Sequence, residues 1–420
     1  MESIFETFKV GAGPSSSHSI GPQRAARILL DRQTTPPACV RVTLQGSLAE
    51  TGRGHLTDRT IIAALYPIAC EIVWDAVSPT PVHPNTMIWQ AINALGFISD
   101  EWRVYSIGGG SLRDDSGPVN TGEVVTYPIS NLADALDWCE KNNSSFRQFV
   151  ELHEPDVWNR LIPIWAAMRD SVERGLKSTD KLLPGSLNLS RQAGTTWERA
   201  QSLQGTRRDL AFLSSFALAV AEENASAGTI VTAPTCGPAG VVAGLLYYFA
   251  TVKKTPLQEI LGALATAGLF GSVIRANASV SGAEVGCQGE IGSACSMAAA
   301  ACSQLLGGSP HQIEYAAEIG MEHHLGLTCD PVEGYVQIPC IERNMAACLR
   351  AFECASFSLL TDGRHRVSFD DVVEVMYRTG LDLQSAYRET ARGGLAAVWR
   401  KRAASTQAAP VVAATEGSVS

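Results

Sequence analysis

Three cysteines stand in unusual surroundings between residues 282 and 344. They occur in the segments Gly286-Cys287-Gln288-Gly289, Thr328-Cys329-Asp330-Pro331 and Ile338-Pro339-Cys340-Ile341. Each lies close to glycine or proline at the edge of a helix-like run, whereas a core cysteine more often sits inside a periodic apolar run. Because thiols at chain reversals can converge on one point, this stretch is predicted to carry the chemistry of the protein.

The spacing of these cysteines favours a metal site without identifying the metal. Cys287 and Cys329 are 42 positions apart, and Cys329 and Cys340 are 11 apart, so no pair is the CxxC of a zinc finger. A fourth ligand is not obvious, since His323 and His324 lie on a helix that could simply bury them. Three thiolates and an open position suit a 4Fe–4S cluster with one exposed iron, or a catalytic zinc ion. The positive end of the helix that follows Cys287 or Cys340 would favour bound thiolates.

Two polar loops in the first third of the chain offer further groups. Residues 11–22 form a hydroxyl-rich loop, with Ser15, Ser16, Ser17 and His18, before a helix-like run. Free N–H groups and hydroxyls at a helix start suit a carboxylate, although a capped helix with a flexible serine run is an equally good interpretation. His55, beside Gly54 at the next helix start, could be a base, yet a lone histidine is more often structural. His83 carries the same two interpretations.

The elements that position these groups change character along the chain. Up to about residue 130, the pattern is mixed α/β, with strands predicted at 40–44 and 102–110 and helices at 23–30 and 59–65. Helical periodicity then dominates, and the predicted helices are 132–142, 145–153, 157–176, 210–223, 240–250, 256–276, 292–306, 310–324, 341–361 and 369–377. The fold class expected is therefore α+β, with an α/β N-terminal domain and an all-α domain.

This pattern predicts four regions. They are an α/β domain at 1–150, a helical linker region at 151–190, an all-α domain at 191–400 and a disordered tail at 401–420. Dense alanine, and glycine in the apolar run 261–273, predict closely packed core helices.

Composition excludes several classes of partner. The net charge of −9 argues against nucleic acid and against an anionic membrane surface. The N-terminus lacks the basic and apolar regions of a signal peptide, so a cytoplasmic protein is expected. In that compartment most of the 11 cysteines are expected to be small buried side chains and not disulfides.

Several motifs together resemble the iron–sulfur L-serine dehydratases of the single-chain type. They are Gly13-Pro14-Ser15-Ser16-Ser17-His18, Gly54-His55-Leu56-Thr57-Asp58, Tyr105-Ser106-Ile107-Gly108-Gly109-Gly110, Ser281-Gly282-Ala283-Glu284-Val285-Gly286-Cys287-Gln288-Gly289-Glu290, Glu322-His323-His324-Leu325-Gly326-Leu327-Thr328-Cys329-Asp330-Pro331 and Gln337-Ile338-Pro339-Cys340-Ile341-Glu342-Arg343-Asn344. The resemblance runs in order from about Phe5 to Gly394 and is strongest after Ala221.

The resemblance implies a function and assigns roles. It implies conversion of L-serine to pyruvate and ammonia by a homodimer with an allosteric-substrate-binding-like α/β domain and a helical catalytic domain. A 4Fe–4S cluster with one open iron would be held by Cys287, Cys329 and Cys340. His55 would be the base, with His18 beside it as a second catalytic residue. The implied substrate contacts are Ser15, Ser16, Ser17, His83, Asn224, Thr235, Asn277 and Ser279.

Two departures and three alternatives stay open. The family usually has asparagine where this chain has Cys236, and single-chain members end in a cysteine that can occupy the open iron, whereas the last cysteine here is Cys354. We therefore expect no C-terminal cysteine on the cluster. Elimination from L-threonine or L-cysteine would use the same groups, and a catalytically silent sensor of serine or iron–sulfur status would keep the cysteines. A pyridoxal phosphate mechanism is disfavoured, because no lysine lies between Lys254 and Lys401.

Overall fold

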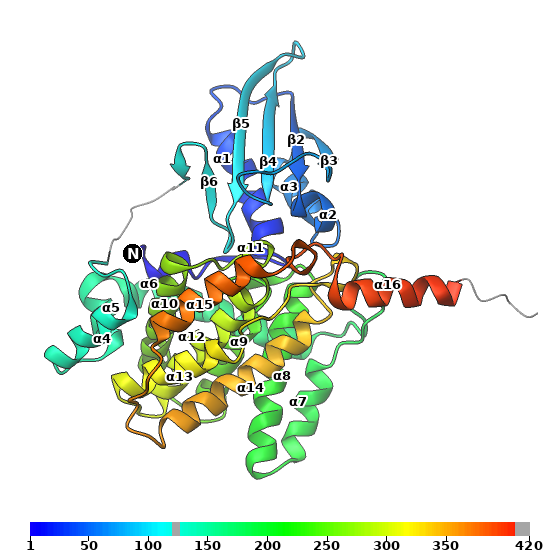
Figure 1. Ribbon diagram of the computed structural model, residues 1–420. Helices are drawn as coiled ribbons and strands as arrows, with labels where there is room; N and C mark the ends of the chain where they lie inside the picture. The colour runs from blue at the N-terminus through cyan, green and yellow to red at the C-terminus, as the bar shows by residue number, and fades with distance from the viewer. Residues whose placement is uncertain (120–126, 408–420) are drawn as a thin grey trace, which may run out of the picture.

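The computed structural model describes residues 1–119 and 127–407. These residues form an α/β domain that packs against one side of a larger helical domain (Figure 1). The expected α+β class is confirmed in this sense: a mixed sheet lies in the N-terminal part and helices form the rest.

A six-stranded sheet with strand order β3-β2-β4-β5-β6-β7 forms the α/β domain. Its strands are β2 (Cys39–Gln45), β3 (Ala69–Asp75), β4 (Thr86–Ile92), β5 (Ile98–Ser106), β6 (Leu112–Asp114) and β7 (Gly117–Pro118). Strands β2 and β3 pair in parallel, which requires a crossover, and the other neighbours are antiparallel. The crossover contains α2 (Ser47–Thr51) and α3 (Thr57–Leu65), and α1 (Gly21–Asp31) follows the short helical turn η2 (Ser16–Ile20).

Alternation along β2 explains which face is covered. Val40, Val42 and Leu44 are fully buried, whereas the residues between them are partly exposed. The buried face joins the apolar sides of α1 and α3 in one core. The loops at one end of this domain, which include η2 and the α2–α3 turn, lie against the helical domain (Figure 1).

The helical domain packs around long alanine-rich helices. Its helices are α4 (Leu132–Lys141), α5 (Phe146–His153), α6 (Val157–Lys177), α7 (Ala193–Ser202), α8 (Gly205–Ala225), α9 (Ala239–Thr251), α10 (Leu257–Asn277), α11 (Gly282–Val285), α12 (Ser293–Leu305), α13 (Pro310–Glu322), α14 (Cys340–Ser358), α15 (Phe369–Asp382) and α16 (Gly394–Gln407). Short helical turns are η1 (Ile4–Glu6), η3 (Gln288–Gly292), η4 (Val332–Gly334) and η5 (Ser385–Tyr387).

Helix α10 shows why the core is so poor in large side chains. Every residue from Ile260 to Ile274 is buried, and the helix packs against α5, α9 and α12, so alanine and glycine permit close approach. The length and hydropathy of α10 would suffice to cross a membrane, yet 83% of its most apolar stretch is buried inside the fold. The predicted close packing of 261–273 is confirmed.

The structure divides the chain differently from the sequence-based division. Ile4 and Phe8 belong to the core of the helical domain, and β1 (Val10–Ala12) pairs with β8 (Thr229–Val231). Residues from Tyr127 onward also pack in that core, and so do Leu161 and Leu183 of the stretch 151–190. Periodicity identified helices 132–153 but carried no information on which core they join.

The last described helix overlaps the start of the tail expected at 401–420. Helix α16 continues to Gln407, as alanine-rich sequence permits, while residues 408–420 lie outside the described part of the chain.

An ion pair in the helical domain predicts a pH-dependent contribution to stability. Nε2 of His365 lies 2.5 Å from Oε2 of Glu314, and the His365 ring stacks on Tyr315 at 4.2 Å. The hydrogen bond with Glu314 raises the pKa of His365 above its ordinary value of 6.5. A raised folded-state pKa stabilises the fold fully below pH 6.5, and the contribution disappears as pH rises through the folded pKa.

We therefore expect His365→Gln to lower the melting temperature more at pH 6 than at pH 8.5. The difference between wild type and variant should be about 1–3 °C larger at the lower pH, since the pair is partly exposed and screened. Thermal melts of both proteins at the two pH values measure it. An equal difference at both pH values would show that the pair carries no charge-dependent stability.

Candidate functional site

A pocket at the junction of the two domains gathers five of the thirteen site residues predicted from the sequence. It contains about 400 Å³ of atom-free space, part of it open to solvent. Its lining residues are Pro14, Ser15, His55, Gly237, Pro238, Cys287, Glu290, Ile291, Cys329, Pro331, Val336, Cys340 and Glu389. The three predicted metal-ligating cysteines and the predicted base thus line one pocket, whereas no lysine lines it.

The cysteines reach the pocket from three turns of the helical domain. Cys287 lies between α11 and η3, which leads directly into α12, and Cys340 is the first residue of α14. Cys329 lies in the loop after α13, and its backbone forms a parallel bridge with Arg388. Cys287 and Cys340 therefore stand at helix starts, as expected, where the helix dipole favours thiolates.

Charge in the cysteine cluster is concentrated on one sulfur. A hydrogen bond from the Cys329 thiol, helped by the nearby Arg343 guanidinium, lowers the pKa of Cys287 to about 6. The same hydrogen bond raises the pKa of Cys329, and burial raises that of Cys340. Arg343 Nη1 donates to the Thr328 carbonyl at 2.8 Å, so this cation is fixed beside the sulfurs.

Glu290 closes the cysteine side of the pocket. Its Oε1 accepts a hydrogen bond from Thr235 Oγ1 at 2.8 Å, and its Oε2 lies 3.9 Å from Cys329 Sγ. Burial, and then the negative charge of Cys287, raise the pKa of Glu290 to about 8. Gly282 explains the close packing here, because a Cβ on it would lie 2.7 Å from Glu290 Oε2 and 3.1 Å from Cys329 Sγ.

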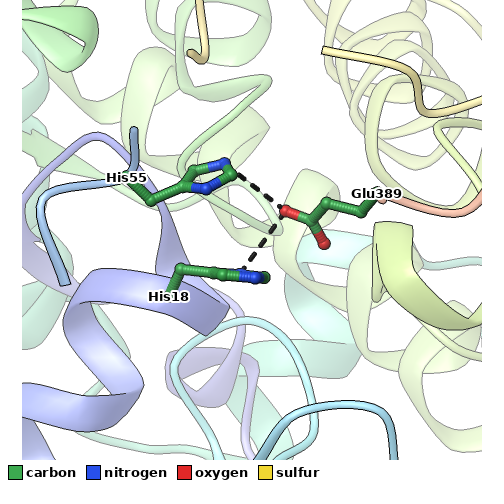
Figure 2. Close-up of side chains that lie close together, drawn as sticks. All are labelled: His18, His55 and Glu389. Carbon is green, nitrogen blue, oxygen red and sulfur yellow. Dashed lines mark ion pairs between the residues drawn. The ribbon is translucent and has the colours of Figure 1, made fainter. Parts of the chain in front are cut away.

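Opposite the cysteines, two histidines of the α/β domain face a carboxylate of the helical domain (Figure 2). Glu389 Oε1 lies 3.5 Å from His18 Nδ1 and 3.6 Å from His55 Nε2, and the two rings are 4.5 Å apart. All three side chains are buried. Among the residues that the structure describes, this group alone brings three possible metal-ligand atoms within 4.8 Å of one another.

Burial favours the uncharged form of each of these three groups. It lowers the pKa of His55 to about 4 and that of His18 well below 6.5, and it raises the pKa of Glu389 well above 4.5. A neutral imidazole with a free lone pair at neutral pH is what a general base requires. Gly54 allows η4 to pack closely against the turn that carries His55, since a Cβ on it would meet the Gly334 carbonyl oxygen at 2.7 Å.

The hydroxyl-rich loop supports the histidines and reaches the pocket. Ser15 lines the pocket and its Oγ accepts a hydrogen bond from the His18 backbone N–H at 3.1 Å. Ser17 Oγ lies 2.8 Å from His18 Nδ1, while Ser16 is buried in the first turn of η2. Asn224 Nδ2 donates to the Pro14 carbonyl at 2.8 Å, so it holds the loop from the helical domain.

Of the eight predicted substrate contacts, Ser15 lines the pocket and the other seven do not; His83, Ser279 and Asn277 are three of the seven. His83 is partly buried, and its Nδ1 accepts from the Asn85 backbone N–H at 3.0 Å. Ser279 is buried and its Oγ accepts from the Ser281 N–H at 3.1 Å, close to the Cys287 turn. Asn277 is exposed at the end of α10, where its Nδ2 donates to the carbonyls of Ser130 and Val273.

Cys236, the departure from the family pattern, is fully buried and does not line the pocket. Its neighbours Gly237 and Pro238 form the wall in its place. A direct substrate contact by this thiol is therefore not seen.

Sequence reasoning missed Glu389 and Arg343 as site residues. Glu389 follows the helical region with no periodicity and no cysteine nearby, so only its place in the fold reveals it. Arg343 stands three positions after Cys340, and a cation near a predicted thiolate was a usable signal. Glu290, three positions after Cys287, belonged to a quoted motif but was given no role.

Comparisons with known proteins agree with this site. The family described as "Serine dehydratase alpha chain" matches residues 86–396, and "Serine dehydratase beta chain" matches residues 3–71. An L-serine dehydratase of Streptomyces coelicolor is 39% identical, over 94% of this chain and 98% of its own length. L-serine dehydratase 2 of Escherichia coli is 38% identical, over 94% of this chain and 98% of its own length. L-serine dehydratase of Helicobacter pylori (strain 26695) is 36% identical, again over 94% and 98%.

The two family matches follow one another along this single chain, and the alignments cover almost the full length of the relatives. With three cysteines, a buried histidine and a hydroxyl-rich loop around one pocket, the chain belongs to the serine dehydratase family.

Proposed function

We propose that this protein removes water from L-serine to give pyruvate and ammonia, with a 4Fe–4S cluster held by Cys287, Cys329 and Cys340. The observation that carries the proposal is the single pocket that joins these cysteines to His55 and Ser15. The names of the relatives, which are L-serine dehydratases, supply the substrate.

The donor set fits a cluster better than it fits one zinc ion. The three sulfurs line a common pocket. Among the described residues, however, they do not meet the condition that all ligand atoms lie within 4.8 Å of one another. A zinc ion needs ligands around one point, whereas the ligands of a cluster bind different irons. Arg343, beside Cys287, would offset negative charge on a thiolate-bound cluster.

When bound, the cluster would supply a Lewis acid for the hydroxyl that leaves. The chain's own residues supply the rest of the reaction. The Nε2 lone pair of His55 takes the proton from Cα, and the electron pair left on Cα forms the double bond as the hydroxyl departs. The released aminoacrylate becomes pyruvate and ammonia in water without further help.

The hydroxyl-rich loop is the proposed site for the substrate carboxylate. Ser15 lines the pocket, and Ser16 and Ser17 open the helical run that continues into α1, so their backbone N–H groups favour an anion. Thr235 and Asn224 are proposed to act indirectly, through Glu290 and through the loop. The family resemblance further predicts a homodimer and an allosteric α/β domain.

Anaerobic reconstitution with iron and sulfide tests the function. We expect a brown protein that forms pyruvate and ammonia in equal amounts from L-serine, with kcat in the ordinary enzyme range of about 1–10³ s⁻¹. L-threonine, L-cysteine and D-serine, measured in parallel, show which substrate is preferred, and the protein before reconstitution is the control. A fully loaded cluster with no turnover of any of them would contradict the proposal and favour a sensor.

A further inference from the structure

One loop of the helical domain forms a wall that runs along the pocket. This wall loop, Pro331 to Cys340, contains η4 and ends at the first residue of α14. Pro331, Val336 and Cys340 all line the pocket. The Gly334 carbonyl lies against the turn that carries His55. The wall loop therefore reaches from the turn of the proposed base to a proposed cluster ligand, and Val336 stands between these two points in the chain.

Hydrogen bonds hold the wall loop in one shape. The Val332 N–H donates to the Ile338 carbonyl at 3.0 Å, which closes the loop on itself. Next to Val336, the side-chain Nε2 of Gln337 donates to the Pro184 carbonyl at 2.6 Å. A ligand group that is too large for the space beside Val336 cannot push this backbone aside without straining these bonds.

The pocket offers few aliphatic surfaces. Val336 and Ile291 are the two branched aliphatic side chains among the described residues that line it, and the others are cysteine, histidine, serine, glutamate, proline or glycine. The Ile291 N–H donates to the Cys287 carbonyl at 2.8 Å, so Ile291 belongs to the cysteine side. Val336 is therefore the aliphatic group on the stretch of wall between the base and the cysteines.

The elimination itself fixes which substrate atom faces this stretch of wall. The proton leaves Cα toward His55, and the hydroxyl leaves Cβ toward the cysteine side. Because Cβ is bonded to both Cα and the hydroxyl oxygen, it must lie between the base and the three cysteines. L-serine has two hydrogens on Cβ, whereas L-threonine and L-allo-threonine each have a methyl group in place of one of them. That methyl group needs space beside Cβ.

We propose that Val336 is a specificity-determining residue: its methyl groups fill the space beside one hydrogen of the substrate β-carbon and exclude amino acids that carry a methyl group there. This inference rests on the proposed function. It gives the substrate class as α-amino acids with a leaving group on an otherwise unsubstituted Cβ. The two threonine diastereomers place the methyl group in the two different hydrogen positions, so the wall acts mainly on the diastereomer whose methyl group points toward it.

Steady-state kinetics of ammonia release from L-serine, L-threonine and L-allo-threonine test the inference on the reconstituted protein. A single methylene in a hydrophobic pocket changes kcat/KM by about 10–200-fold. We expect wild type to prefer L-serine over at least one threonine diastereomer by more than about 100-fold in kcat/KM, and Val336→Ala to lower that preference at least about tenfold. Val336→Thr keeps the shape of the side chain and should keep the preference within about threefold.

Equilibrium binding gives a second readout that does not depend on turnover. The same three amino acids are titrated calorimetrically into reconstituted His55→Asn protein, which lacks the base, with and without Val336→Ala. The ratio of the Kd of the excluded diastereomer to the Kd of L-serine should fall at least about tenfold when Val336 is shortened.

A matched control is Val332→Ala in the same wall loop. Val332 is buried but does not line the pocket, so this variant makes the same chemical change without widening the space beside Cβ. Its preference for L-serine should equal that of wild type. Iron and sulfide contents, measured for every variant, show that the compared proteins carry the same cluster.

Three results would overturn the inference. The first is a wild type that uses both threonine diastereomers within about tenfold of L-serine. The second is a Val336→Ala protein with the preference and the Kd ratio of wild type. The third is an equal loss of preference in Val332→Ala, which would show general loosening of the loop. Wild type that forms no pyruvate from L-serine refutes the proposed function, whereas normal turnover with an unchanged preference in Val336→Ala refutes this inference alone.

Discussion

Replacing Cys329 with serine is expected to abolish both the iron–sulfur absorption and pyruvate formation. The change removes one of only three thiols in the pocket, and it also removes the hydrogen bond that lowers the pKa of Cys287. Loss of an outer-shell partner typically costs about 10–100-fold in metal affinity or activity, so loss of a ligand should exceed about 100-fold. Anaerobic reconstitution followed by visible absorption, iron and sulfide analysis and a pyruvate assay measures the effect.

The matched control for this variant is Cys39→Ser. Cys39 is a half-buried thiol on β2 that does not line the pocket, and its Sγ lies 3.7 Å from the Val40 carbonyl oxygen. It should reconstitute and turn over as wild type does. A Cys329→Ser protein with normal iron and sulfide and normal turnover would show that this thiol holds no iron, and the ligand set would need revision.

Local patterns along the chain were enough to find the cysteine side of the site. Cys287, Cys329 and Cys340 each sit in a turn with glycine or proline, and the helices that follow two of them showed clear periodicity. The helices α8, α10, α12 and α14 were also predictable, because buried alanine-rich runs of this length are almost always helices.

The opposite side of the pocket could not be found in this way. Glu389 approaches His18 and His55 only because the loop at Cys329 pairs with residues 387–389, and that pairing depends on tertiary structure. For the same reason the sequence could not assign α4 and α5 to a core: they look like any amphipathic helices, and only packing shows that they join the helical core. Strands β3 and β4 were also missed, because β3 is an edge strand with no clean alternation.

His55→Asn should lower kcat about 10³-fold while the cluster and the fold remain intact. General base catalysis typically contributes about 10²–10⁴-fold, and the geometry leaves no second base with an equally free lone pair beside the pocket. Asparagine is the most informative substitution, because its amide nitrogen can keep the hydrogen bond that Nδ1 makes to the Thr51 carbonyl at 2.9 Å. The variant therefore loses the basic nitrogen and little else, and added imidazole should restore part of the rate.

His323→Asn is the control that separates chemistry from local structure. Its Nδ1 bonds the carbonyl four residues earlier, Ile319, at 3.0 Å, which is the same local contact that His55 makes with Thr51, but the side chain is exposed. Equal effects of the two substitutions would mean that the shared backbone contact, and not proton transfer, explains the loss. A large loss in His55→Asn alone, with normal iron content and an unchanged melting temperature, leaves proton removal from Cα as the step that this ring performs.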